Sequence, residues 1–321
     1  MMDSTQASEQ RILVVLDATE QQQKALHRAL ELARLTSAKQ LANVKLTLFL
    51  SIYDFSYEMT TMLAAQEREA MRHSLIADRE AWIKDLLSDY DMHGVEHELC
   101  VMWHNRPYEA IVIHAIEQQH DLIIKSTRRH DGLQHVIFTP TDWHILRKAP
   151  CPVLLVKDHD WPQQGHIIAA IHALSDNDHH DSLNRRIIER ALTLAEPLQA
   201  QVHLLNAYPG APMNIAVEIP EFDMVGYGDT LAKQHLLQLQ HYADRYHIPA
   251  ACCHVEEGMP EHVIPEVAER LDAELVVLGT VGRSGFSAAL IGNTAEHVID
   301  HLNCDVLAVK PEGFKSPLAK S

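Results

Sequence analysis

Several features that would assign this 321-residue sequence to other protein classes are missing. No apolar run approaches the roughly 18 residues that suggest a membrane-spanning helix. The sequence does not begin with a basic region followed by an apolar stretch, as a secretory leader does. The five cysteines are an odd number, at spacings typical of neither a disulfide framework nor a C-x-x-C metal pair. We therefore expect a cytoplasmic protein with reduced cysteines and no membrane span.

Positive charge is scarce as well. The sequence has 27 Lys and Arg against 44 Asp and Glu, which gives a formal net charge of −17. Non-specific affinity for nucleic acid comes from Lys and Arg side chains that release condensed counterions, so we expect no nucleic-acid partner. The 46% hydrophobic and 22% charged residues are those of an ordinary globular protein. The length is sufficient for two domains of roughly 150 residues each.

Signatures of catalysis are also missing. The sequence has no G-x-S-x-G elbow, no H-E-x-x-H pair, and no Walker lysine and serine within its glycine-rich segment. Without a placed base, a metal-binding carboxylate or such a lysine, phosphoryl transfer lacks the positioning and electrostatic stabilisation that supply its rate. We expect binding of a small-molecule ligand without fast turnover, and we assign no catalytic residue.

Two histidine-containing groups have side chains of the kind that bind metals. One is the segment of residues 176–181, and the other combines His93, His97, Cys100 and His104. Neither group has the spacing of an established ligand set, so we interpret them as helix-capping residues and polar surface. We assign no metal site.

The sequence contains an internal repeat. When it is shifted by 153 positions against itself, residues 103–157 lie over residues 256–310 without a gap. Upstream, residues 11–17 match residues 166–172. Self-similarity of this extent indicates two copies of one structural unit. Identical pairs include Pro107/Pro260, Ile111/Ile264, Thr127/Thr280, Gly132/Gly285, Thr141/Thr294, His144/His297 and Cys151/Cys304.

The repeat predicts the domain boundaries. We expect an N-terminal domain over residues 1–157 and a C-terminal domain over residues 166–321, joined by a linker at 158–165. Within each half, short Val, Ile and Leu runs alternate with amphipathic helical stretches, which is typical of a parallel sheet covered by helices. We predict an α/β fold of two tandem, doubly wound, five-stranded parallel-sheet domains of the flavodoxin-like type. The strands expected in the second domain are 166–172, 201–208, 251–256, 274–279 and 305–310.

A glycine-rich loop follows the fourth strand of the second domain and precedes its last helix. In an open parallel sheet, ligands bind beyond the carboxyl ends of the strands. Gly279 and Gly282 let the backbone approach a ligand, and Gly292 frees the amides of a helix N-terminus to face an anion. Asn293 and Thr294 add short polar side chains there. These features favour a phosphate site, with an ordinary turn as the alternative interpretation.

The glycine spacing resembles that of the universal stress protein family, whose ATP-binding members carry G-x2-G-x9-G-[S/T] after the fourth strand. Gly279, Gly282 and Gly292 match the three glycines, and Asn293 stands where the family usually has Ser or Thr. The resemblance extends over nearly the whole chain. It implies a fold like that of the adenine nucleotide α-hydrolases, a stress-response role, and ATP or a related nucleotide as the ligand.

The resemblance also implies that the two halves have divided the parts of one site. The family's Asp at the end of the first strand is present as Asp17, but the first domain replaces the glycines by Ser126, Arg129 and Thr139. The second domain keeps the glycines and has His172 in place of the Asp. We expect the ligand in the second domain, because His172 can still hydrogen-bond to it. The candidate residues are Gly279, Thr280, Gly282, Gly292, Asn293, Thr294, His172 and Tyr208, with a degenerate first-domain site of Asp17, Ser126, Arg129, Thr139 and Thr141.

The fifth strand of each half has an implied role in pairing. Single-domain members of the family commonly dimerise through this strand, and residues 151–157 and 304–310 correspond to it. A strand edge with unpaired amides tends to find a partner, and covalent joining makes that pairing intramolecular. We predict a pseudo-twofold monomer in which these two strands pair.

Three alternatives stay open. Arg128, Arg129 and His130 could neutralise an anion in the first domain, although a solvated basic loop is the simpler interpretation. A slow ATP hydrolase is the second alternative. A carrier of an acyl or other apolar group is the third, because residues 211–220 would place an apolar wall at the ligand edge of the second sheet.

Overall fold

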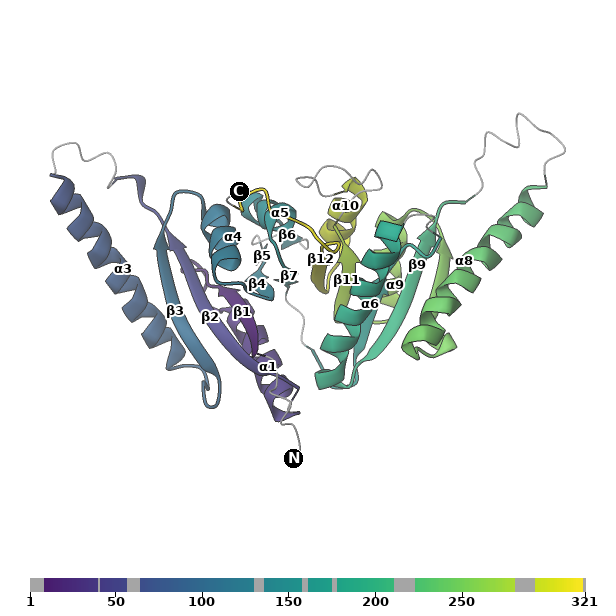
Figure 1. Cartoon of the computed structure of the whole chain (residues 1–321), viewed down its shortest axis with the longest axis horizontal. Coiled ribbons are helices and arrows are strands. Elements are labelled where there is room, and N and C mark those ends of the chain that lie inside the picture. Colours follow the sequence, from purple (N-terminus) through teal and green to yellow (C-terminus); the bar gives the residue numbers. More distant parts are fainter. Residues whose placement is uncertain are drawn as a thin grey trace. The chain divides into compact units, whose positions relative to one another are not determined.

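The computed structural model divides the chain into two compact units (Figure 1). The first unit comprises Met1–Arg128, Phe138–Val156 and Lys315–Ser321, and the second comprises Arg129–Ile137 and Lys157–Phe314. The structure describes residues 9–39, 41–56, 64–129, 136–157, 161–174, 178–210, 223–280 and 292–319.

The first unit is built on a parallel sheet of five strands in the order β7-β4-β1-β2-β3. The order reverses at β1, as in a doubly wound sheet. The strands are β1 (Glu9–Val15), β2 (Asn43–Ile52), β3 (Glu96–Trp103), β4 (Leu122–Ser126) and β7 (Val153–Val156). The helices are α1 (Lys24–Ala38), α3 (Ala65–Leu87), α4 (Pro107–Glu117) and α5 (Pro140–Lys148). Two short strands, β5 (Arg128–Arg129) and β6 (Val136–Ile137), form a separate two-stranded sheet.

The second unit repeats this arrangement, with the strand order β10-β9-β8-β11-β12 and parallel pairing throughout. The predicted α/β fold with five parallel strands in each unit is confirmed. The strands are β8 (His166–Ala170), β9 (Gln201–Tyr208), β10 (Cys253–Glu257), β11 (Leu275–Gly279) and β12 (Asp305–Val309). The helices are α6 (Asp178–Leu198), α8 (Met224–Tyr246), α9 (Pro260–Arg270) and α10 (Asn293–His301), with one 3-10 turn, η1 (Ala250–Cys252).

Burial explains why the central strands are almost continuously apolar. Leu13, Ile124 and Val276 have no exposed surface, because helices cover the strands on which they lie. In the first unit α1 packs against β1, β2 and β4, and α3 packs against β3; in the second, α6 packs against β8 and β11, and α8 against β9 and β10 (Figure 1). Among the described helices, none has the length and apolar character needed to span a membrane.

Two predictions, the pairing of the fifth strands and the domain limits, are not tested by the structure of the separate units. The pairing of residues 151–157 with residues 304–310 stays a prediction. The domain limits of 1–157 and 166–321 also stay a prediction. Of the expected linker, residues 158–160 lie outside the described residues.

Three histidines form a hydrogen-bonded chain across neighbouring strands of the second unit. Nδ1 of His166 lies 3.0 Å from Nε2 of His203, and Nδ1 of His203 lies 3.0 Å from Nε2 of His254. A neutral imidazole has one donor and one acceptor nitrogen, so neutral His203 can donate to one neighbour and accept from the other. Burial, followed by the neighbouring His254 and His166, lowers the pKa of His203 to about 4.

The hydrogen-bonded histidines predict that the stability of the protein depends on pH. His203 in the unfolded chain titrates near about 6.5. Between that pH and about 4, the unfolded chain binds a proton that the folded chain does not, so stability should fall as the pH falls through this window. The contribution is at most about 3 kcal/mol, since one pKa unit corresponds to about 1.4 kcal/mol.

The measurement is urea unfolding of the wild type and of His203→Gln between pH 4 and pH 7.5. The variant should lose part of the pH slope. The matched control is His262→Gln, which changes an exposed histidine on α9 and should keep the wild-type slope. If the free energy of unfolding depended on pH equally in all three proteins, the pH dependence could not be assigned to His203.

Candidate functional site

Each unit has a cavity at the carboxyl edge of its sheet. The first-unit cavity, of about 440 Å³, is lined by residues that follow β1, β2 and β4. The second-unit cavity, of about 180 Å³, is lined by residues at the ends of β8, β9 and β11. Both cavities therefore lie where open parallel sheets bind their ligands.

The second-unit cavity brings together four of the predicted site residues. His172 follows β8, Gly279 ends β11, and Gly292 and Thr294 lie at the start of α10, and all four line the cavity. His172 is more than 100 positions from the other three residues in the sequence, and the parallel sheet brings them to one edge.

The other predicted residues of the second unit have different places. Thr280 is fully buried, and its N–H donates to the carbonyl of Val309 at 3.2 Å. Tyr208 is also buried, and its ring stacks on His235 at 4.7 Å between centroids. Gly282, the side chain of Asn293 and residues 211–220 lie outside the described residues.

Asn184 positions the loop that carries His172, and sequence reasoning missed it. Its side-chain oxygen accepts from the His172 N–H at 3.2 Å, and its Nδ2 donates to the His172 carbonyl at 2.8 Å. The same Nδ2 donates to the hydroxyl of Tyr242 at 3.2 Å, and that hydroxyl donates to Asp181 at 2.7 Å. The signal in the sequence was a polar residue on the apolar face of the helix, and the structure shows that it is buried.

The N-terminus of α10 has no side-chain cap of its own. Gly292 is the N-cap residue, and its carbonyl accepts from the Glu296 N–H at 3.1 Å. The Gly292 N–H donates to the Thr280 carbonyl at 3.3 Å, which joins the start of the helix to the end of β11. The first amides of a helix have no partners within it, so an anion can satisfy them.

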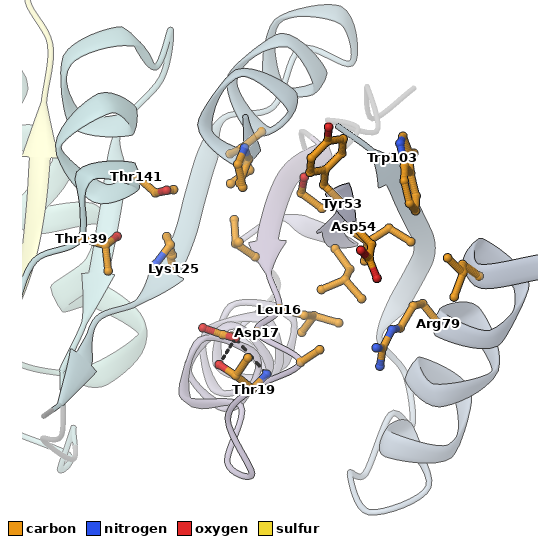
Figure 2. A pocket seen from close by; sticks show the side chains of 18 residues that line it. Leu16, Asp17, Thr19, Tyr53, Asp54, Arg79, Trp103, Lys125, Thr139 and Thr141 are labelled. Atoms are coloured by element: carbon orange, nitrogen blue, oxygen red, sulfur yellow. Dashed lines mark hydrogen bonds between the residues drawn. The ribbon is translucent and has the colours of Figure 1, made fainter. Parts of the chain in front are cut away.

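The first-unit cavity contains three residues of the predicted degenerate site (Figure 2). Asp17, Thr139 and Thr141 line it, whereas Ser126 does not, and the Arg129 side chain lies outside the described residues. Asp17 Oδ1 accepts from the backbone N–H of Thr19 at 3.0 Å and from its hydroxyl at 2.6 Å. Sequence reasoning missed the other charged and aromatic lining residues, which are Tyr53, Asp54, Arg79, Trp103 and Lys125.

A carboxylate caps the N-terminus of α5 in the first unit. Asp142 Oδ2 accepts from the backbone N–H of Thr139 at 2.7 Å and from its hydroxyl at 2.8 Å. The Asp142 N–H donates back to the Thr139 hydroxyl at 3.3 Å, which completes a capping box. The other oxygen, Oδ1, lies 2.7 Å from Nζ of Lys125. Unlike α10, this helix begins with its own anion in place.

The remaining candidates give no metal site in the part of the chain that the structure describes. There, no group of three or more His, Cys, Asp and Glu side chains is arranged to hold a metal ion. Residues 175–177 and His130 lie outside the described residues. All five cysteines are free thiols, and burial raises the pKa of Cys100 to about 11.

Comparisons with known proteins agree with one another. The model of the Universal stress protein family matches residues 9–157 and 178–310. The universal stress protein E sequences of Salmonella typhi and Escherichia coli K12 are each 48% identical to this chain, over 96% of this chain and 96% of the relative. The universal stress protein E homolog of Haemophilus influenzae is 41% identical, over 94% of this chain and 97% of the relative.

Solved structures give the same result. The crystal structure of a putative universal stress protein from Pseudomonas aeruginosa UCBPP-PA14 superposes with a TM-score of 0.70 at 29% sequence identity, covering 95% of this chain and 94% of that chain. A universal stress protein from Archaeoglobus fulgidus superposes with a TM-score of 0.58 at 13% identity, covering 94% of this chain and 96% of that chain.

The close packing at Gly279 predicts a steric effect. A Cβ at this position would lie 2.7 Å from Cδ2 and 3.2 Å from Cγ of Leu183, which lines the cavity on α6. Gly279→Ala should therefore lower the free energy of unfolding by about 1–3 kcal/mol. The matched control is Gly228→Ala in α8, where a Cβ meets nothing within 4 Å, and where stability should not fall. Chemical denaturation measures both.

A double-mutant cycle tests whether the contact with Leu183 causes the loss of stability in Gly279→Ala. Gly279→Ala combined with Leu183→Ala should cost less than the sum of the two single changes, because removing the Leu183 side chain relieves the contact. Strictly additive costs would show that Leu183 is not the group displaced.

Proposed function

Because this chain belongs to the universal stress protein family, we propose that it is a cytoplasmic stress-response protein that binds a nucleotide such as ATP in its second unit. Another phosphate-bearing ligand would use the same groups. The proposal places the phosphate at the N-terminus of α10 and the rest of the ligand against the ends of β8 and β11.

The observation that carries this proposal is the uncapped start of α10. At this start Gly292, Thr294 and Ala295 line the cavity and none of them carries a carboxylate, and Glu296, the acidic residue of the first turn, does not line it. The helix dipole adds a partial positive charge at this end, which favours an anion. A phosphate is therefore the type of group that best completes the site.

Two side chains supply further hydrogen bonds. Thr294 is exposed at the first turn of α10, so its hydroxyl can donate to a phosphate oxygen. His172 lines the cavity beyond β8, where its ring can bond to a sugar or base. The two hydrogen bonds between the Asn184 side chain and the His172 backbone fix this loop, so it is already in place before a ligand binds.

A carrier of an apolar group is the second candidate function, and the lining favours it. Much of the second-unit cavity wall consists of aliphatic side chains: Ile171, Leu183, Ile187, Leu205, Ile264, Leu278 and Val298. An acyl chain would bury its surface against them. Native mass spectrometry of the purified full chain distinguishes the two functions, because a co-purified acyl compound adds a mass that no nucleotide explains.

The prediction compares equivalent threonines of the two units. Thr294→Val should weaken ATP binding by roughly 2- to 12-fold, since a net hydrogen bond contributes about 0.5–1.5 kcal/mol. Thr141→Val is the matched control: it makes the same change at the corresponding position of the first unit and should leave the affinity unchanged. Isothermal titration of the full-length variants with ATP measures both.

Two results would contradict the proposal. One is the absence of ATP binding by the wild type, and the other is a loss of affinity in Thr141→Val that Thr294→Val does not show. A phosphate-release assay on the same samples separates binding from slow hydrolysis, because only hydrolysis produces free phosphate.

A further inference from the structure

Asp142 is an internal anion at the first-unit cavity. Its side chain has no exposed surface, and its two oxygens are held by Thr139 and by Lys125. Thr139 and Lys125 both line the cavity (Figure 2), whereas Asp142 is not among the lining residues. The carboxylate thus sits at the start of α5, where a bound anion could otherwise use the same donors, the N–H and hydroxyl of Thr139 and the Lys125 ammonium.

The ion pair is matched in charge and is largely removed from solvent. The Lys125 side chain is 12% exposed and the Asp142 side chain 0% exposed. A buried carboxylate without a partner is strongly unfavourable, and here Lys125 and the Thr139 donors are the partners of Asp142. An anionic ligand entering this position would have to displace a group that already has every contact that the ligand could make.

The other charges at the cavity do not attract anions either. Asp17 and Asp54 line it together with Arg79, so the lining outside the ion pair has one net negative charge. Hydrogen bonds from the Ser56 side chain and backbone lower the pKa of Asp54, which keeps it ionised. The rings of Tyr53 and Trp103, 5.7 Å apart between centroids, add faces that attract cations.

The second unit has no counterpart of the Asp142 carboxylate, the Lys125 cation or the Thr139 hydroxyl at the equivalent positions. Under the 153-residue repeat, Asp142 corresponds to Ala295, Lys125 to Leu278 and Thr139 to Gly292. All three counterparts line the second-unit cavity. The carboxylate, its cation and its hydroxyl donor are therefore replaced together, which leaves the start of α10 uncapped.

We propose that Asp142 is the specificity-determining residue of the first unit: it occupies the anion position at α5 and restricts the adjacent cavity to uncharged or cationic ligands. The two units then select ligands of different charge with the same fold. The assignment of Asp142 stands on the first unit alone, and only the prediction for the second unit depends on the proposed function.

The test is the number of inorganic tripolyphosphate ions that the full-length chain binds in isothermal titration. Asp142→Ala should bind one more equivalent than the wild type, because it frees the N–H and hydroxyl of Thr139 together with Lys125. The charge-matched control is Asp89→Ala, which removes an exposed carboxylate of the first unit and should bind no additional ion. The reverse exchange, Ala295→Asp, should remove the equivalent that the second unit binds.

These variants separate the two proposals. If the wild type binds no tripolyphosphate but Asp142→Ala binds one equivalent, the proposed function fails and the assignment of Asp142 stands. If folded Asp142→Ala binds no more than the wild type, the assignment of Asp142 is wrong. Circular dichroism establishes folding, and Lys125→Leu with Asp142→Ala, which copies the second unit, serves if Asp142→Ala alone unfolds.

The wild type provides a measurement that does not depend on any variant. When tripolyphosphate is added to the ¹⁵N-labelled chain, the amide resonances of Thr139, Thr141 and Asp142 should not shift. A saturable shift of these resonances would overturn the proposal, because it would place an anion at α5 in the presence of Asp142.

Discussion

The first amides of a helix have no partners within that helix, and we propose that this constraint decides what each unit can bind. A parallel sheet brings the starts of its helices to one edge, so the unsatisfied amides face the ligand cavity. In the first unit the Asp142 carboxylate accepts from the N–H and hydroxyl of Thr139, the N-cap residue of α5, and pairs with Lys125. In the second unit, we propose, Gly292 and Ala295 leave this position to a ligand. The two cavities thus share a fold and differ in the residues at the start of one helix.

The open helix is anchored at its other end. Nζ of Lys157 donates to the carbonyls of Ile299 and Leu302, which are the last carbonyls of α10, and its backbone N–H donates to Asp305 at 2.7 Å. A cation at a helix C-terminus is favourable with respect to the dipole. Burial nonetheless lowers the pKa of Lys157 to about 8, so the charge is retained at neutral pH. The helix can therefore present its amides rigidly although its N-terminus lacks a cap.

The sequence predicted the fold and part of the site, for reasons that the structure makes clear. The repeat and the alternating apolar runs are local patterns, and they sufficed for two parallel sheets. Strand ends and glycine spacing placed His172, Gly279, Gly292 and Thr294 at one cavity. Asp142 was missed because its role depends on a contact with Lys125, on another element, that no spacing rule encodes. Asn184 was missed for the same reason, since its partners His172 and Tyr242 lie after β8 and on α8.

The central claim is that the start of α10, and not that of α5, receives a phosphate. A crystal structure of the full chain with a non-hydrolysable ATP analogue tests it most directly. The account predicts phosphate density within hydrogen-bonding distance of the amides at Gly292–Thr294, with the Lys125–Asp142 pair unchanged. Phosphate density beside Lys125 in the first unit, with α10 vacant, would contradict it.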